Sequence, residues 1–165
     1  MTVFRNGKVE DAAEMAGIFN FYVRTSPVIF SDTVLSADDM RTKIKRLGIG
    51  DRFPFIIAED NGKMLGYAYA HLWQPDPVYD HTWELTMYLS HNATGKGLGS
   101  MMLPRLVAEC QELGAHALIA CITEGNAPSE RMVTKAGFTL AGVCREVGYK
   151  FGKYYSDAIY QLLLG

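Results

Sequence analysis

A glycine-rich segment, Thr94–Ser100 with the sequence TGKGLGS, is the part of the chain best suited to bind an anion. Its glycines at Gly95, Gly97 and Gly99 let the backbone turn sharply and leave N–H groups uncovered. The helix expected to follow, which ends near Leu113, directs the positive end of its dipole to the same place. Phosphate is the usual anion at such a site, although many loops of this kind only cap a helix.

The segment does not match two better-known phosphate-binding templates. A P-loop needs four residues between its first glycine and a Gly-Lys-Ser/Thr, and this arrangement is absent. A dinucleotide-binding fingerprint has wider glycine spacing than Gly95-x-Gly97-x-Gly99 and an acidic residue about 20 positions further on. The elements around the segment must therefore decide its chemistry.

Hydrophobic periodicity predicts the elements that position this segment. Strands are expected at Val3–Arg5, Phe53–Ala58, Met64–Trp73, Thr82–Leu89, Ala117–Ile122, Phe138–Glu146 and Tyr154–Leu163, and helices at Glu10–Val23, from Ser36 to about Leu47, from the glycine segment to Leu113 and at Pro128–Ala136. The order is one strand, two helices, three strands, a helix, a strand, a helix and two strands. It predicts a mixed α/β fold (α+β), with a central sheet of about seven strands and about four helices on both faces.

Three local signals fix parts of this arrangement. Ser36 is expected to cap a helix, with Asp39 three residues on. Asp60-Asn61-Gly62 predicts a tight hairpin turn between two strands. The strand Thr82–Leu89 alternates, so that one face carries Trp83, Leu85, Met87 and Leu89, and the other Thr82, Glu84, Thr86 and Tyr88.

Composition excludes several functional classes. With 165 residues, 48% of them hydrophobic and 21% charged, residues 1–165 are expected to form a single domain with a real core. A net charge of −2 argues against a nucleic acid partner. No apolar run approaches the roughly 20 residues of a membrane span, and Met1–Arg5 does not begin a signal peptide. We therefore expect no membrane association.

The cysteines and histidines do not indicate a metal site. Cys110, Cys121 and Cys144 are odd in number and widely spaced, and are expected to be reduced, mostly buried thiols of a cytoplasmic protein. No pair of cysteines or histidines has metal-ligand spacing, so no metal is expected.

The order of elements, the glycine segment after the fourth strand, and Asn126-x-x-Ser129 followed by Lys135–Phe138 resemble the GNAT acetyltransferases. Within that superfamily the chain is most similar to the phosphinothricin and methionine sulfoximine N-acetyltransferases. The stretches that carry this closer resemblance are Gly66–Ala70, Tyr79–Tyr88 with Thr82-x-Glu84, and Arg145–Gly152. The resemblance covers nearly the whole chain, and it implies that acetyl-CoA is the co-substrate.

The resemblance also implies which residues hold acetyl-CoA. Its diphosphate would lie on the loop made of Thr94, Gly95, Lys96, Gly97, Leu98, Gly99 and Ser100, where Thr94 replaces the glutamine or arginine usual in the family. The backbone of Met87, Tyr88 and Leu89 would pair with the pantetheine arm as an added strand does. Asn126, assisted by Ser129, would bond the pantetheine or phosphate region.

Glu84 is our candidate for the catalytic base. An amine must lose its proton before it attacks the thioester, since a free amine with a pKa of roughly 8 to 10.4 is mostly protonated at neutral pH. The matching glutamate in the family takes that proton, often through water. From the residues alone, a surface or salt-bridged strand glutamate is the more common interpretation of Glu84. The family implies that a backbone N–H near Met87 or Tyr88 donates to the oxyanion.

The general acid stays open. Many GNAT proteins have a tyrosine, and this group often a histidine, seven residues after the asparagine, but here Val133 stands there. Either the thiolate leaves unaided, or another donor such as Tyr154 or Tyr155 reaches it.

The acceptor pocket implied by the resemblance is built from Phe30, Tyr69, His71, Trp73 and Tyr79, with His81 beside them. Each of these is also a plausible core residue. Relatives commonly carry two arginines in the loop after Trp73, where this chain has Gln74 and Asp76. An arginine fork suits a carboxylate or phosphinate, so we expect poor use of phosphinothricin and a preference for a less anionic amine.

The sequence thus predicts a cytoplasmic N-acetyltransferase that moves an acetyl group from acetyl-CoA to a small amino-acid-like amine, by direct attack in a ternary complex. Relatives form homodimers, so a homodimer is expected. Two alternatives remain at this point: an acetyltransferase for a polyamine or a protein N-terminus, and an acyl-CoA-binding sensor without turnover.

Overall fold

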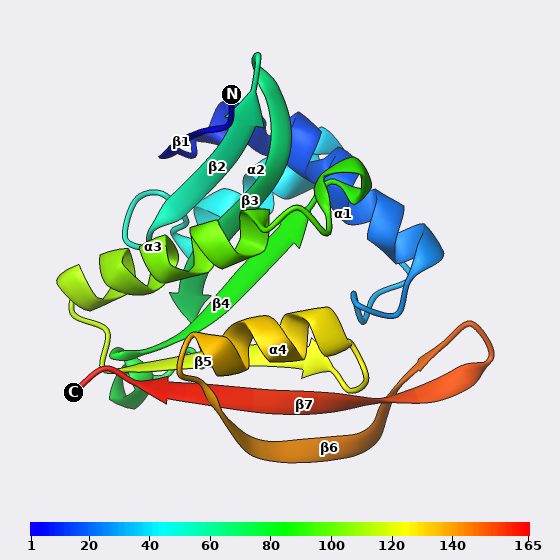
Figure 1. Cartoon of the computed structure of the whole chain (residues 1–165), viewed down its shortest axis with the longest axis vertical. Helices are drawn as coiled ribbons and strands as arrows, with labels where there is room; N and C mark the ends of the chain where they lie inside the picture. The colour runs from blue at the N-terminus through cyan, green and yellow to red at the C-terminus, as the bar shows by residue number, and fades with distance from the viewer.

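The computed structural model describes all 165 residues, and its seven strands form one sheet in the order β1-β2-β3-β4-β5-β7-β6 (Figure 1). The elements are β1 (Val3–Asn6), α1 (Ala12–Thr25), α2 (Ala37–Leu47), β2 (Phe55–Asp60), β3 (Lys63–Leu72), β4 (Thr82–Leu89), α3 (Leu98–Glu112), β5 (Ala117–Thr123), α4 (Ala127–Lys135), β6 (Thr139–Lys150) and β7 (Lys153–Leu163), with 3₁₀ turns at Val9–Asp11, Pro77–Tyr79 and His91–Ala93. All neighbouring strands are antiparallel except β4 and β5. The expected order of elements and mixed sheet are confirmed.

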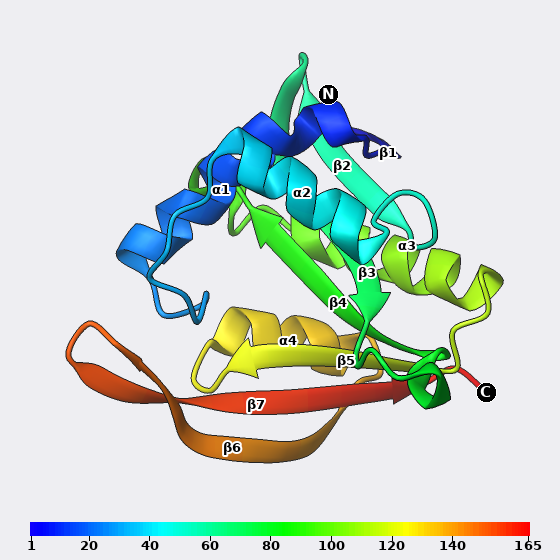
Figure 2. The ribbon, with the colours of Figure 1, turned by 180° about the vertical axis from the view of Figure 1, so that it is seen from behind.

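The helices cover the two faces of the sheet in pairs. Helices α3 and α4 lie on one face in Figure 1, and α1 and α2 lie on the other in Figure 2. One hydrophobic cluster includes Met102 and Leu106 of α3, and the second includes Met15 and Phe19 of α1. The second cluster takes its strand residues from β2 and β3 with Tyr88 beside them, so this helix pair covers only the β1–β4 half of its face.

The two local signals for α2 and for the first hairpin are confirmed. Ser36 Oγ accepts from the Asp39 N–H at 3.0 Å, and the Asp39 carboxylate accepts from the Ser36 N–H at 2.9 Å. This reciprocal capping box stabilises the helix start, where a single cap contributes about 1 kcal/mol. Asn61 and Gly62 both have positive φ, 50° and 75°, as the turn that best fits a twisted hairpin requires.

Several element boundaries differ from the expectation by one to four residues, and two of them have a local cause. Strand β2 begins at Phe55 instead of Phe53, because Pro54 has no N–H to give to the ladder. Strand β6 runs on to Lys150 instead of ending at Glu146, because an irregularity with Glu146 at φ 54° lets pairing with β7 resume at Gly148. The resulting β6–β7 hairpin projects beyond the rest of the sheet (Figure 1).

The cysteines are more exposed than the sequence suggested. Cys110 is buried in α3, but Cys121 and Cys144 are exposed, and all three are free thiols. In β5, Leu118, Ala120 and Ile122 pack under α3 and α4, so alternation turns Cys121 to the opposite face. No helix covers β5 there, and the expectation of mostly buried thiols was therefore wrong.

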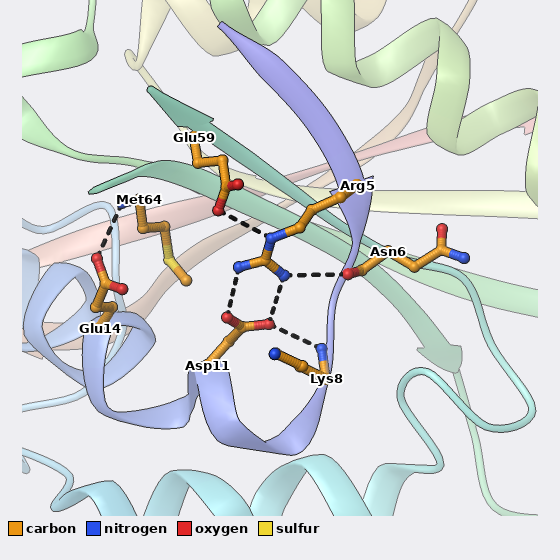
Figure 3. A network of polar contacts seen from close by, with 7 residues as sticks. All are labelled: Arg5, Asn6, Lys8, Asp11, Glu14, Glu59 and Met64. Carbon is orange, nitrogen blue, oxygen red and sulfur yellow. Dashed lines mark hydrogen bonds and ion pairs between the residues drawn. The ribbon is translucent and has the colours of Figure 1, made fainter. Parts of the chain in front are cut away.

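An ion-pair network fastens the first strand to the sheet (Figure 3). The Arg5 guanidinium donates to both oxygens of Asp11, at 2.7 and 2.9 Å, and to Glu59 at 2.9 Å. Burial alone raises the pKa of Asp11, but the bonds from Arg5 and from the Lys8 N–H outweigh it and lower that pKa. The charge of Asp11 is thus stabilised in the fold, and its contribution to stability is lost as the pH falls through that lowered pKa.

No helix of the chain has both the length and the hydropathy that a bilayer span requires.

Candidate active site

The glycine segment leaves its backbone donors free. Gly95 and Gly97 have φ values of 73° and 78°, a left-handed conformation that few side chains tolerate. No backbone N–H from Thr94 to Ser100 donates a hydrogen bond within the chain. The segment therefore presents a run of aligned amides, which form the kind of concavity that binds phosphate oxygens.

The start of α3 adds to the positive potential of this segment. Gly97 is the N-cap and supplies no side chain, and no acidic residue lies in the first turn. The helix dipole is therefore not balanced by the protein itself. A Cβ on Gly99 would lie 2.8 Å from Met132 Sδ, so the Met132 side chain would have to shift to admit a larger residue there. The Lys96 ammonium donates to the Asn92 carbonyl at 2.9 Å and lies within the loop.

Strands β4 and β5 part just after Glu84. They pair only at Thr82–Glu84 with Ala117–Ile119, and then diverge (Figures 1 and 2). Beyond this point β4 continues to Leu89 on the ladder with β3, and β5 continues to Thr123 on the ladder with β7. Each strand thus has one free edge facing the gap, and the glycine segment follows the end of β4.

The free edge of β4 belongs to its odd-numbered residues. The Trp73 N–H donates to the Thr82 carbonyl, and the Ser90 N–H donates to the Leu65 carbonyl, which sets the hydrogen-bonded pairs of this ladder. Backbone groups alternate in direction along a strand. Leu85, Met87 and Leu89 therefore direct their N–H and C=O groups to the gap.

Of the three backbone positions expected to bind pantetheine, Met87 and Leu89 thus face the gap, and the backbone of Tyr88 pairs with Tyr67 of β3. The Leu89 carbonyl also accepts a bond from the Tyr22 hydroxyl at 2.5 Å. The Met87 N–H and C=O are accordingly the most available pair of backbone groups in the middle of this edge.

Asn126 and Ser129 lie across the gap, at the start of α4. Asn126 is the N-cap, but its side chain makes no capping bond and is half-buried. The Ser129 side chain is also half-buried, one turn into the helix. Both polar groups are free to bind a ligand that lies between the ends of β4 and β5.

Glu84 is half-buried at the point where the two strands part. Its side chain is 27% exposed, and His71 Nε2 lies 4.0 Å from Glu84 Oε2. Burial, the largest influence, raises the pKa of Glu84, and His71 acts in the opposite direction. A carboxylate with a raised pKa is a stronger base than a solvated one, as proton abstraction requires.

Ionisable groups from three further elements surround Glu84. The Cys121 thiol of β5 is one. The residue as a whole is exposed, but protein atoms around its sulfur exclude part of the water, and this, followed by the Glu84 charge, raises its pKa to about 12. Asp157 of β7, whose pKa is raised by burial, is a second. Lys43 of α2 is the third, and it lowers the pKa of Glu84. The site thus holds one carboxylate pair, one protonated thiol and one cation.

Lys43 was not identified from the sequence, although its spacing could have shown it. Met40, Lys43, Ile44 and Leu47 follow the i, i+3, i+4, i+7 pattern of a buried helical face. The Lys43 ammonium lies 5.0 Å from the ring centre of Phe19 and makes no ion pair. Burial, then Arg46, lowers the pKa of Lys43, and Glu84 raises it. The cation therefore faces the sheet near Glu84 without a partner.

The structure brings together only part of the expected acceptor pocket. His71 lies directly opposite Glu84, and Tyr69 lies opposite Thr86, all on the face covered by α1 and α2. Tyr69 is 3% exposed. Trp73 and Tyr79 instead pack edge to face with each other, 5.5 Å between ring centres, in the loop between β3 and β4.

Phe30 lies apart from Tyr69 and His71, beside strand β6. It packs against Gly148 of β6 beside a cavity of about 170 Å³, on the segment that follows α1. Lys150 holds this segment in place, since its buried ammonium donates to the carbonyls of Tyr22, Ser26 and Ile29. No local sequence signal could predict these Lys150 hydrogen bonds, because the partners lie more than 120 residues away.

None of the positions considered for a general acid places a proton donor at the site. Val133 is 3% exposed and belongs to the core under α4. Tyr154 is 62% exposed on the projecting hairpin, where it packs on Tyr149, and the Tyr155 ring lies under the Lys153 ammonium. No group of three or more His, Cys, Asp or Glu side chains is arranged to hold a metal ion.

Comparisons with known proteins agree with this geometry. Residues 5–159 match the family model described as an acetyltransferase (GNAT) domain. The chain is 32% identical to a phosphinothricin N-acetyltransferase of Alcaligenes faecalis over 153 residues, which cover 92% of this chain and 77% of that protein. It is also 32% identical to an L-methionine sulfoximine/L-methionine sulfone acetyltransferase of Salmonella typhimurium, over 93% of this chain and 90% of that protein.

The fold is shared with solved structures. A GNAT superfamily phosphinothricin acetyltransferase from Sinorhizobium meliloti, in complex with acetyl-CoA, superposes with a TM-score of 0.94 at 29% identity. The superposition covers 99% of this chain and 89% of that chain. The similarity thus extends over the whole sheet and all four helices.

Proposed function

This chain belongs to the GNAT acetyltransferases, the family its residues indicate, and we propose that it acetylates the primary amine of a small amino acid by direct attack in a ternary complex. That it is an acetyl-CoA-dependent N-acetyltransferase follows from the family and its named members. The observation that carries the finer proposal is the half-buried Glu84, which lies where β4 and β5 part, with His71 Nε2 4.0 Å from its carboxylate.

The residues present fit acetyl-CoA. The free amides of Thr94–Ser100 and the unbalanced dipole of α3 suit its diphosphate. The free edge of β4 at Met87 and Leu89 suits the amides of the pantetheine arm, with Asn126 and Ser129 on the other side. Bound in this way, acetyl-CoA supplies an activated acetyl group close to Glu84. The Met87 N–H is our candidate donor to the thioester oxygen.

Glu84 is our candidate base. The acceptor amine arrives protonated, and the Glu84 carboxylate takes one proton so that the nitrogen can attack. The second proton, which the nitrogen loses as the amide forms, goes to the departing thiolate or to water. Because Val133 cannot donate a proton, we propose that the thiolate of coenzyme A leaves unaided. No covalent enzyme intermediate is needed, and the raised pKa of Cys121 makes its thiol a poor nucleophile.

Lys43 is our candidate for the group that recognises the acceptor carboxylate. It is the one lysine or arginine whose charge acts on the pKa of Glu84, it is half-buried, and it makes no ion pair in the chain. An α-amino acid would place its amine at Glu84 and its carboxylate at Lys43. A single cation suits one carboxylate better than the two acidic groups of phosphinothricin, which agrees with the loss of arginines at Gln74 and Asp76.

The test is thiol release from acetyl-CoA with a panel of amines, in the wild type and in Lys43→Met. We expect turnover with neutral L-amino acids, methionine sulfone and methionine sulfoximine, and a lower kcat/KM for phosphinothricin. Lys43→Met should raise KM for an amino acid about 10- to 100-fold, since a charge-assisted bond contributes about 1.5–3 kcal/mol. KM for the matching amine without a carboxylate should stay the same.

Lys45→Met is the matched control, because Lys45 is exposed on the same helix; it should leave both KM values unchanged. Turnover with spermidine or with a peptide N-terminus, but not with amino acids, would favour the other acceptor classes. Saturable acetyl-CoA binding without any thiol release would favour a sensor. An unchanged KM for amino acids in Lys43→Met would remove Lys43 from the acceptor site.

We also propose a homodimer that uses the projecting β6–β7 hairpin. Val147, Tyr149, Phe151 and Tyr154 are each more than half exposed there. Large apolar side chains grouped on a surface usually mark a contact site. The relatives' dimers, expected from the resemblance, agree with this.

We propose a cytoplasmic location. The three cysteines are free thiols, two of them exposed. Exposed free thiols persist in a reducing compartment.

A further inference from the structure

His71 is the residue opposite Glu84 on the neighbouring strand, and we propose that it is a positioning residue that receives, through Glu84, the proton taken from the acceptor amine. This inference rests on the proposed function, because it needs Glu84 to act as the base. It adds a second step to the path of that proton, from the buried carboxylate to solvent.

The hydrogen bonding of the His71 ring fixes which nitrogen is free. His71 Nδ1 lies 2.8 Å from the Leu72 carbonyl oxygen. A carbonyl can only accept, so Nδ1 carries a hydrogen and donates it. In the neutral ring, Nε2 therefore holds a lone pair, and this is the atom that lies 4.0 Å from Glu84 Oε2.

The other groups around Glu84 are poorer acceptors for its proton. The Cys121 thiol is protonated at neutral pH, since its pKa is raised to about 12. Lys43 is a cation and carries its full set of protons. Asp157 is a carboxylate, which is a weaker base than an imidazole. His71 Nε2 is thus the group whose lone pair and position suit the transfer.

The partial exposure of the Glu84 and His71 side chains lets the proton pass to solvent. The Glu84 side chain is 27% exposed and that of His71 is 18% exposed, so each has a surface that water reaches. The Tyr69 ring lies tilted beside the imidazole, with 6.1 Å between ring centres, and limits its movement on that side. The imidazole is therefore held at Nδ1 by Leu72, and water reaches part of its side chain.

The proton balance of the step is complete without any other reagent. The acceptor N–H bond breaks, and the proton forms an O–H bond on Glu84. That bond then breaks, and the proton passes to His71 Nε2, which yields an imidazolium that still donates from Nδ1 to Leu72. Because 4.0 Å exceeds a hydrogen bond, the transfer needs a small side-chain rotation or one bridging water. The imidazolium then releases the proton to water, and Glu84 is again ionised.

The test uses His71→Asn, which keeps an amide N–H for the Leu72 carbonyl but has no basic nitrogen, and His71→Ala, which leaves room for an added base. We expect kcat to fall about 10-fold or more in both variants, with KM for acetyl-CoA unchanged. Free imidazole should restore the kcat of His71→Ala. Pyrazole, a ring of the same shape but a far weaker base, should not restore it.

His116→Gln is the control, since His116 is exposed and lies outside the site; it should keep the wild-type kcat. The inference is overturned if His71→Asn and His71→Ala keep the wild-type kcat, or if pyrazole restores activity as well as imidazole does. In either case the proposed function stands, because the wild type is active. If the wild type itself releases no thiol with any amine, the proposed function and this inference fail together.

Discussion

Glu84→Gln is expected to lower kcat at neutral pH about 10²- to 10⁴-fold, the range that general-base catalysis contributes. The amide keeps the shape of the side chain but cannot take a proton from the acceptor ammonium. Raising the pH should restore part of the activity of the variant, because an α-amine with a pKa of about 8 loses its proton to solvent near pH 9. Thiol release measured from pH 6 to 9, with an amino acid acceptor, checks both expectations.

Glu109→Gln is the matched control for this experiment. The Glu109 side chain is 28% exposed, close to the 27% of Glu84, but it pairs with Arg105 on α3. This variant should keep the wild-type kcat, and both variants should bind acetyl-CoA with the wild-type affinity. If Glu84→Gln turned over at the wild-type rate at pH 7, Glu84 would not be the base.

The second large effect is expected at the glycine segment. Gly97 has a φ of 78°, and a Cβ there would meet no other atom within 4 Å, so a side chain costs only backbone strain. A β-branched residue in this conformation costs about 1–3 kcal/mol. Gly97→Val should therefore shift the amides of Thr94–Ser100 and raise the Kd for acetyl-CoA about 10- to 100-fold. Calorimetric titration measures this change.

Gly62→Val separates strain from binding. Gly62 has a φ of 75°, a Cβ there would also meet nothing within 4 Å, and it lies in the β2–β3 hairpin turn. Both variants should lower Tm, but only Gly97→Val should weaken acetyl-CoA binding. Equal affinities in the two variants would mean that the conformation of the glycine segment does not determine binding.

Features with a local cause could be predicted from the sequence. The capping box of Ser36 and Asp39, and the turn at Asn61-Gly62, each depend on residues within three positions of one another. The alternation along Thr82–Leu89 correctly placed Glu84 and Trp83 on opposite faces of β4. These signals helped to predict the order of elements, and the glycine segment with the Asn126-x-x-Ser129 motif then indicated the family by resemblance.

Features that depend on contacts distant in sequence could not be predicted in this way. The separation of β4 from β5 after Glu84 is visible only in the pairing of strands. The exposure of Cys121 follows from how far α1 and α2 extend over the sheet. Trp73 and Tyr79 were expected in one pocket with Tyr69, but they pack on each other. The presence of an aromatic residue in the sequence does not by itself show whether its side chain lines the acceptor pocket.

The proposed binding of acetyl-CoA depends most on the backbone amides that face the gap. Amide hydrogen exchange with and without acetyl-CoA tests them directly. The N–H groups of Thr94–Ser100 donate no hydrogen bond in the chain and should exchange rapidly in the free protein. Saturation with acetyl-CoA should slow exchange in Thr94–Ser100 and at Met87 and Leu89, and leave the β6–β7 hairpin unchanged. Saturable binding with no slowing of exchange in Thr94–Ser100 would show that these amides do not hold the diphosphate of acetyl-CoA.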